Sequence, residues 1–265
     1  MGEGRVRICC VQAKSVPGEP EQNLARAKEC ALQAKQQGAS LVIFPEQYPT
    51  GWDPHDTAFT DDGSGVICAG WAAVATASGI HVLGSYRKKT ESMPQNVVAV
   101  FAPDGACMAE YAKIHLFSPG GEDASFSPGD TLACFTLNGV RFGLAICYDL
   151  RFPDLFSAYA RAGCDAVVVP AAWPCARLRH WDLFLHARAL ENQIYMAGVN
   201  PAGGRTGEVN CGGTVVVDPW GEMVARTADA ETALLCADID KGAVLAARAA
   251  FPVRADRRDE LYPSL

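Results

Sequence analysis

The beginning of the chain alternates between two hydrophobic patterns, and this alternation limits the folds that the chain can adopt. Arg5 to Ala13 and Leu41 to Phe44 are apolar runs typical of buried strands. Between them, Glu21 to Gln37 places its apolar residues on one helical stripe and is followed by Gly38. A helix between two such strands joins them in parallel by a right-handed crossover. We therefore expect a parallel α/β sheet.

The same alternation returns later in the chain. Arg141 to Ile146 indicates a strand, Pro153 suits the first position of a helix, and Asp165 to Val169 is again a buried strand. Hairpins lie between and after these two halves, one of them across Asn138-Gly139. Since no long Pro- or Ser-rich linker interrupts the chain, we predict one domain over residues 1–265. It is an α/β fold with two sheets face to face and helices outside.

The remaining elements follow from the same patterns. Strands are predicted over 80–86, 96–102, 107–111, 131–138, 195–200, 212–218, 223–227 and 234–238. Helices are predicted over 66–78, 181–193 and 241–249. Loops are predicted over 118–129 and 203–207, which are rich in Gly, Pro and Ser or lie between strands.

Charge and cysteine content indicate which partners and which cellular compartment to expect. The net charge of −7 and the scattered Lys and Arg residues argue against a nucleic-acid partner or an anionic membrane surface. The most apolar window, residues 66–80, is too short to span a bilayer. The odd number of 11 cysteines, the lack of a Cys-x-x-Cys pair and the lack of a secretory signal favour free thiols in a reducing compartment. We expect a cytoplasmic protein.

Cys147 stands where the strand over 141–146 stops. The carboxyl ends of strands form the edge at which α/β folds collect ligand-binding side chains. A cysteine at such a position is either a small hydrophobe of the core or a nucleophile. A nucleophilic thiol needs a nearby base or cation, because its ordinary pKa of about 8.5 leaves it protonated at neutral pH.

Two charged residues stand at comparable positions. Glu46 follows the strand over 41–44, and Lys113 follows the hairpin strand over 107–111. Solvated loop and surface positions are the common alternatives for such residues. If they instead meet Cys147 in one pocket, they supply a carboxylate base and an ammonium group, with His115 as the alternative base.

Other kinds of catalytic site lack their motifs here. The chain has no Gly-x-Ser-x-Gly for a serine hydrolase, no Gly-x-Gly-x-x-Gly and no Walker sequence. The best-spaced histidines, His180 and His186, fall on different faces of the predicted helix. We therefore predict no metal site and no cofactor.

Three segments together resemble the signatures of the nitrilase, or carbon–nitrogen hydrolase, superfamily in the expected order. They are Phe44-Pro45-Glu46, Lys113 within Tyr-Ala-Lys-Ile-His-Leu-Phe, and Cys147 within Cys-Tyr-Asp-Leu-Arg-Phe-Pro. Segments 187–192, 218–221 and 256–262 also look like family features. The resemblance implies an α-β-β-α sandwich that forms homodimers through its outer helices and acts on a small-molecule amide without a cofactor.

The resemblance also implies roles for individual residues. Glu46 would be the general base, Cys147 the nucleophile that forms a thioester, and Lys113 the oxyanion stabiliser, helped by the backbone N–H of Tyr148. Many members carry a second glutamate shortly after the lysine, and Glu122 is the matching residue. It would position the lysine and the substrate amide, whereas without the resemblance a solvated loop glutamate is the commoner interpretation.

Within the superfamily, the cysteine motif and the residues around Trp173 most resemble the omega-amidase branch. That branch hydrolyses the terminal amide of short 2-oxo acid monoamides such as 2-oxoglutaramate. The far carboxylate of such a substrate needs a cation, for which Arg177, Arg179 and His115 are candidates. Tyr148 and Trp173 are the other expected substrate contacts. Ala172 departs from the branch, which often has Asn at this position, so the substrate is less fixed than the reaction.

Sister activities remain open at this point. N-carbamoyl amino acid amidohydrolases, deaminated-glutathione amidases and nitrilases use the same Glu-Lys-Cys triad, although nitrilases proper are usually longer. A binding protein that keeps the fold without catalysis is the alternative from another class. Ammonia release from a panel of amides distinguishes these alternatives.

Overall fold

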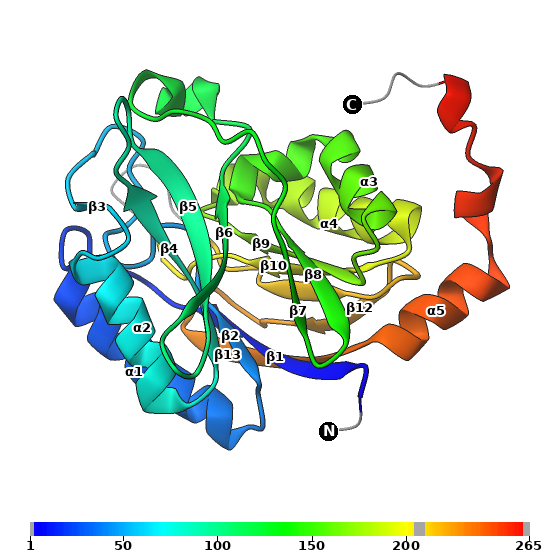
Figure 1. Ribbon diagram of the computed structural model, residues 1–265, viewed down its shortest axis with the longest axis horizontal. Coiled ribbons are helices and arrows are strands. Elements are labelled where there is room, and N and C mark those ends of the chain that lie inside the picture. Colours follow the sequence, from blue (N-terminus) through cyan, green and yellow to red (C-terminus); the bar gives the residue numbers. More distant parts are fainter. Residues whose placement is uncertain (1–2, 204–209, 262–265) are drawn as a thin grey trace.

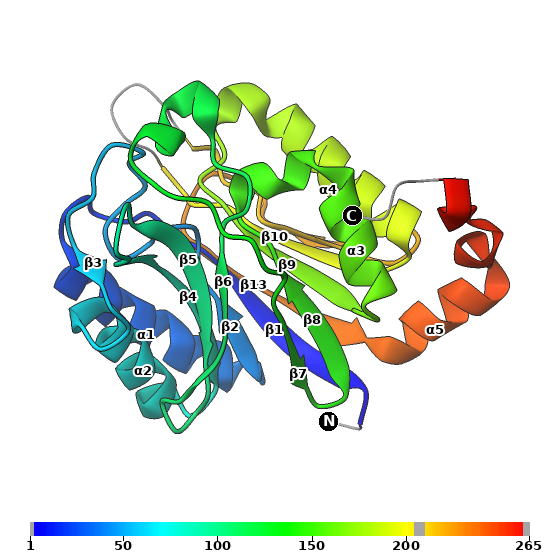
Figure 2. The same cartoon turned by 45° about the horizontal axis from the view of Figure 1, so that its top comes forward.

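Two β-sheets pack face to face, and helices cover their outer sides (Figure 1). The computed structural model describes residues 3–203 and 210–261. Figure 2, a turned view, shows the same order of layers, with one pair of helices on each outer side. The predicted α/β class and the α-β-β-α layering are confirmed.

The first sheet has seven strands in the order β13-β1-β2-β4-β5-β6, with β3 beside β4. Strands β1, β2 and β4 are parallel, and Ile8 of β1 lies opposite Leu41 of β2. The strands of this sheet are β1 (Arg5–Gln12), β2 (Leu41–Ile43), β3 (Thr60–Asp61), β4 (His81–Lys88), β5 (Gln95–Phe101), β6 (Cys107–Ala112) and β13 (Ala233–Asp240).

The second sheet has six strands in the order β12-β11-β10-β9-β8-β7. Strands β8, β9 and β10 are parallel, while β7 and β8 form the predicted hairpin. The strands of this sheet are β7 (Cys134–Leu137), β8 (Val140–Leu144), β9 (Ala166–Pro170), β10 (Tyr195–Val199), β11 (Val215–Val217) and β12 (Met223–Arg226).

Four helices form the outer layers. Helices α1 (Pro20–Gln36) and α2 (Val66–Ser78) cover the first sheet, and α3 (Pro153–Arg161) and α4 (Leu178–Asn192) cover the second. Helix α5 (Lys241–Ala250) follows β13 and leads away from the sheets (Figure 1). The short 3₁₀ segments are η1 (Ser118–Gly120), η2 (Glu122–Ala124), η3 (Cys147–Arg151), η4 (Cys175–Arg177), η5 (Val253–Asp256) and η6 (Asp259–Leu261).

The alternation of side chains along each strand builds three cores. On β1, Ile8 and Cys10 enter the core between the sheets, whereas Cys9 and Val11 face the helices. The strand β9 divides its residues in the same way. Because both faces of these strands are covered, they appear in the sequence as continuous apolar runs.

One close approach between helix and sheet occurs in each half. A Cβ atom at Gly84 of β4 would lie 2.3 Å from the ring of Trp71 on α2, and one at Gly198 of β10 would lie 2.6 Å from the ring of Trp181 on α4. Only glycine leaves room for these rings. The two halves therefore repeat one packing solution, as the repeated strand–helix pattern suggested.

Most predicted elements are confirmed to within a few residues, and α2 has the predicted bounds. The helix predicted over 181–193 begins earlier, at Leu178, and the loop predicted over 118–129 contains η1 and η2. Strand β3 was not predicted. Of the loop predicted over 203–207, only Gly203 lies within the described residues, and Tyr262 of the segment 256–262 also lies outside them.

The prediction of free thiols is wrong for one pair of cysteines. Cys175 and Cys211 form a disulfide, while the other nine cysteines are free. The two residues are 36 positions apart, and no spacing rule links such a pair.

Candidate active site

Three predicted site residues come from the ends of strands in both sheets. Glu46 follows β2, Lys113 follows β6, and Cys147 follows β8 as the first residue of η3. Glu122 begins η2, in the segment that follows Lys113. Because the strands end at the same edge of the sandwich, these side chains converge.

Glu46, Lys113 and Glu122 form a fully buried cluster, here called the lysine cluster. The Lys113 ammonium donates to Glu46 Oε1 at 2.8 Å and to Glu122 Oε2 at 2.8 Å. The side-chain amide of Asn96, on β5, donates to Glu46 Oε1 at 2.7 Å and to Glu122 Oε1 at 2.9 Å. Two carboxylates thus share two donors.

Backbone groups satisfy the other contacts of the two carboxylates. The N–H of Ala172 donates to Glu46 Oε2 at 3.0 Å, and the N–H of Phe117 donates to Glu122 Oε2 at 2.7 Å. The exposed fraction is 2% for Glu46 and zero for Lys113 and Glu122. The solvated alternatives for these three residues are therefore excluded.

Electrostatics fix the charge of the lysine. Burial alone would lower the pKa of Lys113, but the carboxylates of Glu46 and Glu122 outweigh it and raise this pKa above the ordinary value. Burial raises the pKa of Glu46, and repulsion from Glu122 adds to it, while Lys113 acts in the opposite direction. A carboxylate whose pKa is raised is a stronger base than one in water.

Cys147 sits in a strained turn beside the lysine cluster. Its φ is +44°, in the left-handed region that non-glycine residues rarely adopt outside functional sites. Burial raises the pKa of its thiol well above the ordinary value, and the negative charge of Glu46 contributes. Lys113 and the N–H of Ala172 favour the thiolate, but they do not reverse the shift. The resting residue is therefore a thiol, and it needs a base.

Asp149, which the sequence analysis did not single out, ties the cysteine turn to the lysine segment. Its buried carboxylate accepts hydrogen bonds from the N–H of Ile146 at 2.9 Å and from the hydroxyl of Tyr111 at 2.8 Å. It also accepts the N–H of His115 at 2.9 Å. Ile146 directly precedes Cys147, whereas Tyr111 and His115 lie two residues before and two residues after Lys113. One carboxylate thus links the two segments.

His115 is not brought to the substrate side. Its Nδ1 lies 2.8 Å from Oδ1 of Asp149, and its ring stacks on Phe152 with the ring centroids 3.7 Å apart. It lines neither of the two hollows described below. The structure therefore supports it neither as the alternative base nor as a contact for the substrate carboxylate.

Two adjoining hollows open beside these residues. The larger, of about 320 Å³, is lined by Glu46, and the smaller is lined by Cys147. Trp52, Phe117 and Ala172 line both, so the hollows are parts of one cleft. Other residues that line the smaller hollow are Tyr148, Arg151, Trp173, Pro174 and Arg177. Of the predicted substrate-binding residues, Tyr148, Trp173 and Arg177 thus lie beside the cysteine.

Two guanidinium groups line the smaller hollow. Arg177 lies 5.6 Å from the ring centroid of Phe117, and Arg151 lies 4.8 Å from that of Trp173. Burial lowers the pKa of Arg151, and Arg177 adds to this effect. Sequence reasoning missed Arg151, although it lies inside the cysteine motif, whereas Arg179 is exposed and lines neither hollow.

A buried arginine holds one wall of the larger hollow. Arg87 of β4 donates to Gln47 Oε1 at 3.0 and 3.2 Å and pairs with Asp56 at 2.9 Å. The chain between these two partners includes Trp52 and His55, which line the hollow. Gln47, directly after the predicted base, also has a positive φ of +49°. The wall is thereby anchored to the first sheet.

Comparison with known proteins assigns the family. The family model described as carbon-nitrogen hydrolase matches residues 7–249. This chain belongs to the carbon-nitrogen hydrolase family. It is 35% identical to an omega-amidase of Xenopus tropicalis over 97% of each chain, and 31% identical to a 2-oxoglutaramate amidase of Bacillus subtilis over 96% of this chain and 98% of that one. The predicted superfamily and its enzymatic character are confirmed.

Solved structures of an amidase from Nesterenkonia sp. share the fold of this carbon-nitrogen hydrolase. One has a TM-score of 0.86 and 28% identity, and the match covers 99% of this chain and 96% of that one. A mutant of the Nesterenkonia enzyme, with a TM-score of 0.86 and 29% identity over 98% and 97% of the chains, shows covalent addition of the acetamide moiety of fluoroacetamide at the active site cysteine.

Neither a metal centre nor a membrane segment is found in the described part of this carbon-nitrogen hydrolase. Over residues 3–203 and 210–261, no three His, Cys, Asp or Glu side chains are grouped so that they could hold a metal ion. Over the same residues, every helix is too short or too polar to cross a membrane.

Proposed function

We propose that this enzyme hydrolyses the terminal amide of a small carboxylic acid amide, such as 2-oxoglutaramate, through a thioester on Cys147. The observation that carries the proposal is the buried lysine cluster beside a cysteine in a strained, left-handed turn. The similarity to proteins named omega-amidase and 2-oxoglutaramate amidase supports the substrate class.

The first half of the reaction acylates the cysteine. Glu46 accepts the thiol proton while Sγ forms a bond to the amide carbon, and the carbonyl oxygen becomes an oxyanion. The Lys113 ammonium, with the N–H of Tyr148, stabilises this charge. Glu46 then gives the proton to the amide nitrogen, the C–N bond breaks, and ammonia leaves.

The second half returns the enzyme to its resting state. Glu46 takes a proton from a water molecule as that water attacks the thioester carbon. The second tetrahedral intermediate collapses, the C–S bond breaks, and the proton returns to Cys147 as the carboxylic acid leaves. Glu122 accepts a hydrogen bond from Lys113, so its role in this scheme is to hold the ammonium in place.

Recognition of the distant carboxylate falls to the arginines of the smaller hollow. Arg177 and Arg151 place two cations beside Cys147, where an anionic end of the substrate can accept their hydrogen bonds. Tyr148 and Trp173 supply the apolar walls between them. The two cations therefore favour an anionic amide, such as a short diacid monoamide, over a neutral one.

Ammonia release from a panel of substrates tests this function. The panel contains 2-oxoglutaramate, butyramide, an N-carbamoyl amino acid and a nitrile, each assayed with the wild type and with Cys147→Ala. We expect fastest turnover of the 2-oxo acid amide, no turnover by the variant, and an acyl adduct on Cys147 detectable by mass spectrometry. Full activity of Cys147→Ala would refute the mechanism. Faster turnover of the carbamoyl compound would show that the enzyme is an N-carbamoyl amino acid amidohydrolase instead.

We also propose that the enzyme is a cytoplasmic homodimer that pairs through α4 and the segment after α5. Leu183 and Leu190 of α4 and Phe251 are large apolar side chains that are more than half exposed in one chain. Light scattering is expected to give twice the chain mass, and Leu183→Glu to give the monomer. Fractionation of source cells tests the location.

A further inference from the structure

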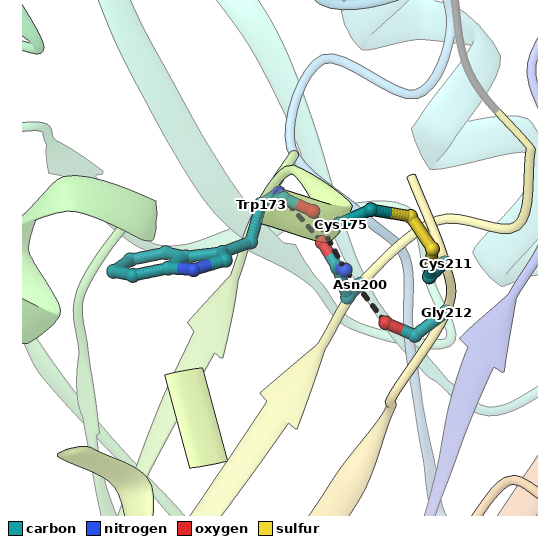
Figure 3. Close-up of a disulfide and its surroundings, with 5 residues drawn as sticks. All are labelled: Trp173, Cys175, Asn200, Cys211 and Gly212. Carbon is teal, nitrogen blue, oxygen red and sulfur yellow. Dashed lines mark hydrogen bonds between the residues drawn. A yellow bond between two sulfur atoms is a disulfide. The ribbon is translucent and has the colours of Figure 1, made fainter. Parts of the chain in front are cut away.

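Chain neighbours of the Cys175–Cys211 disulfide line both hollows of the cleft, and Figure 3 shows the bond close to Trp173 and Gly212. Cys175 begins η4, which ends at Arg177, so it stands between two residues of the smaller hollow, Pro174 and Arg177. Cys211 follows Asn210, which lines the larger hollow. The bond therefore joins the arginine-bearing turn to the opposite part of the cleft.

Hydrogen bonds hold the start of this turn independently of the disulfide. The N–H of Trp173 donates to Oδ1 of Asn200 at 2.7 Å, and Nδ2 of Asn200 donates to the carbonyls of Trp173 at 3.0 Å and Gly212 at 2.7 Å. Figure 3 shows Asn200 between these two segments. Asn200 directly follows β10, and neither cysteine takes part in these hydrogen bonds, so they can form whether the cysteines are oxidised or reduced.

The end of the turn is held differently. The N–H of Arg177 donates to the carbonyl of Pro174 at 3.0 Å, and the indole N–H of Trp173 donates to the carbonyl of Arg177 at 2.8 Å. Both hydrogen bonds stay within the turn. Arg177 leads directly into α4, which begins at Leu178. The disulfide at Cys175 is the covalent attachment of the start of the turn to the segment of Cys211, and a single β-bridge between Pro174 and Asn210 accompanies it.

We propose that the Cys175–Cys211 disulfide positions Arg177 for the substrate carboxylate, so that its reduction selectively weakens binding of anionic amides. This inference rests on the proposed function. With the bond formed, the disulfide fixes the first residue of the η4 turn and α4 follows its last, so the guanidinium is ordered before binding. With the bond reduced, Asn200 still holds Trp173 and α4 still follows Arg177, but the turn between them loses its covalent attachment, so more of the ordering of the guanidinium falls to the substrate.

The redox step is an ordinary thiol–disulfide exchange. A dithiol reagent donates two electrons and two protons, the Sγ–Sγ bond breaks, Cys175 and Cys211 become thiols, and the reagent closes to its own disulfide. Oxidation by a small-molecule disulfide runs the same exchange in reverse. Both cysteines are half-buried rather than enclosed, so reagents can reach them.

Kinetics on two substrates test the proposal. The wild type is prepared in oxidised and dithiothreitol-reduced forms, with the state of both cysteines measured by peptide mass spectrometry and intact Cys147 counted by active-site titration. For 2-oxoglutaramate we expect KM to rise about three- to tenfold on reduction, the range for ordering one long side chain on binding. For neutral butyramide, KM and kcat stay within about twofold.

Three variants provide the controls. Cys175→Ser and Cys211→Ser are expected to show the KM of the reduced wild type and no further change with redox state. Cys107→Ser removes an exposed free thiol on β6 and is expected to keep the redox response. A response to dithiothreitol that persists in Cys175→Ser comes from another cysteine and would overturn the proposal.

The possible failures are distinguishable. If neither amide releases ammonia in either state, the proposed function is wrong. If both amides are hydrolysed but reduction changes the two KM values equally or not at all, the positioning role is wrong and the disulfide is merely structural. Detection of Cys175 and Cys211 as free thiols after treatment with oxidised glutathione would also overturn the proposal.

Discussion

The two sides of the cleft are built in opposite ways. The lysine cluster is fully buried, and its charges are bound by one another, by Asn96 and by backbone N–H groups. The arginine side is half-buried, and its cations lie over aromatic rings on short 3₁₀ turns. The difference suits the proposed tasks, because chemistry requires fixed dipoles in a dry site, whereas recognition of a substrate end tolerates adjustment.

The comparison has an energetic side. A buried ion cluster is stable only while every charge keeps its partner, so the loss of one member leaves the others uncompensated. A half-buried guanidinium can turn toward water when its neighbour changes. We therefore expect substitutions on the first side to affect both folding and turnover, and substitutions on the second to affect substrate binding alone.

The largest effect is expected for Lys113→Ala. This change removes the oxyanion stabiliser and leaves two buried carboxylates facing each other, so turnover is lost and the free energy of unfolding falls by about 3–5 kcal/mol. Urea denaturation and ammonia release measure the two effects. Arg177→Ala is the matched control and should change stability by less than about 0.5 kcal/mol. Equal losses of stability in the two variants would contradict the expected difference between the two sides of the cleft.

A loss mainly of kcat, with a smaller loss of stability than in Lys113→Ala, is expected for Glu46→Gln. The amide keeps the shape but cannot accept a proton, so kcat should fall about 10²- to 10⁴-fold. Glu46 acts as a base when it is ionised. Wild-type kcat/KM should therefore be highest above the pKa of Glu46 and should fall as the pH falls through this pKa. Because that pKa is raised, the acid limb should lie above the ordinary carboxyl range. If the acid limb lies at the ordinary carboxyl pKa, or persists unchanged in Glu46→Gln, then the titrating group is not Glu46.

A smaller loss is expected when the link between the two segments is weakened. Asp149→Asn places an amide among three N–H and O–H donors, which should shift the cysteine turn relative to the lysine and lower kcat about 100-fold. Tyr111→Phe is the control, since it removes one donor and keeps the carboxylate, and it should cost far less. If both variants lose the same kcat, Asp149 supports only the local packing.

The smallest effect is expected on the arginine side. Arg177→Gln should raise KM for 2-oxoglutaramate about tenfold, as for loss of one charge-assisted hydrogen bond, and leave kcat and the KM for butyramide nearly unchanged. Steady-state kinetics on both substrates measure this. A fall in kcat for butyramide would show that the arginine side takes part in the chemistry as well.

Sequence patterns predicted the part of the candidate site that lies at strand ends. The apolar runs before Glu46, Lys113 and Cys147 place all three at strand ends, and parallel strands bring such ends to one edge. Glu122 depended on the family resemblance, because a loop residue next to Asp123 gives no sign of burial. The strand and helix boundaries followed from periodicity because both faces of each sheet are covered.

The features that patterns did not predict depend on contacts between distant segments. Asp149 accepts hydrogen bonds from donors on β6 and in the chain that follows it. Arg87 donates to a loop that begins some forty residues before it in sequence. The Cys175–Cys211 pair has no spacing signal, and its formation depends on how η4 meets the chain after β10. Such partners become visible only once the fold is known.

The protonated state of Cys147 has a consequence for chemical durability. Alkylating agents and peroxides react with thiolates, and a thiol whose pKa is raised presents very little thiolate at rest. We therefore expect Cys147 at rest to react slowly with such reagents, until a carbonyl carbon arrives at bonding distance and Glu46 can take the proton. The burial that makes the proposed nucleophile dependent on its base would then also limit its alkylation and oxidation.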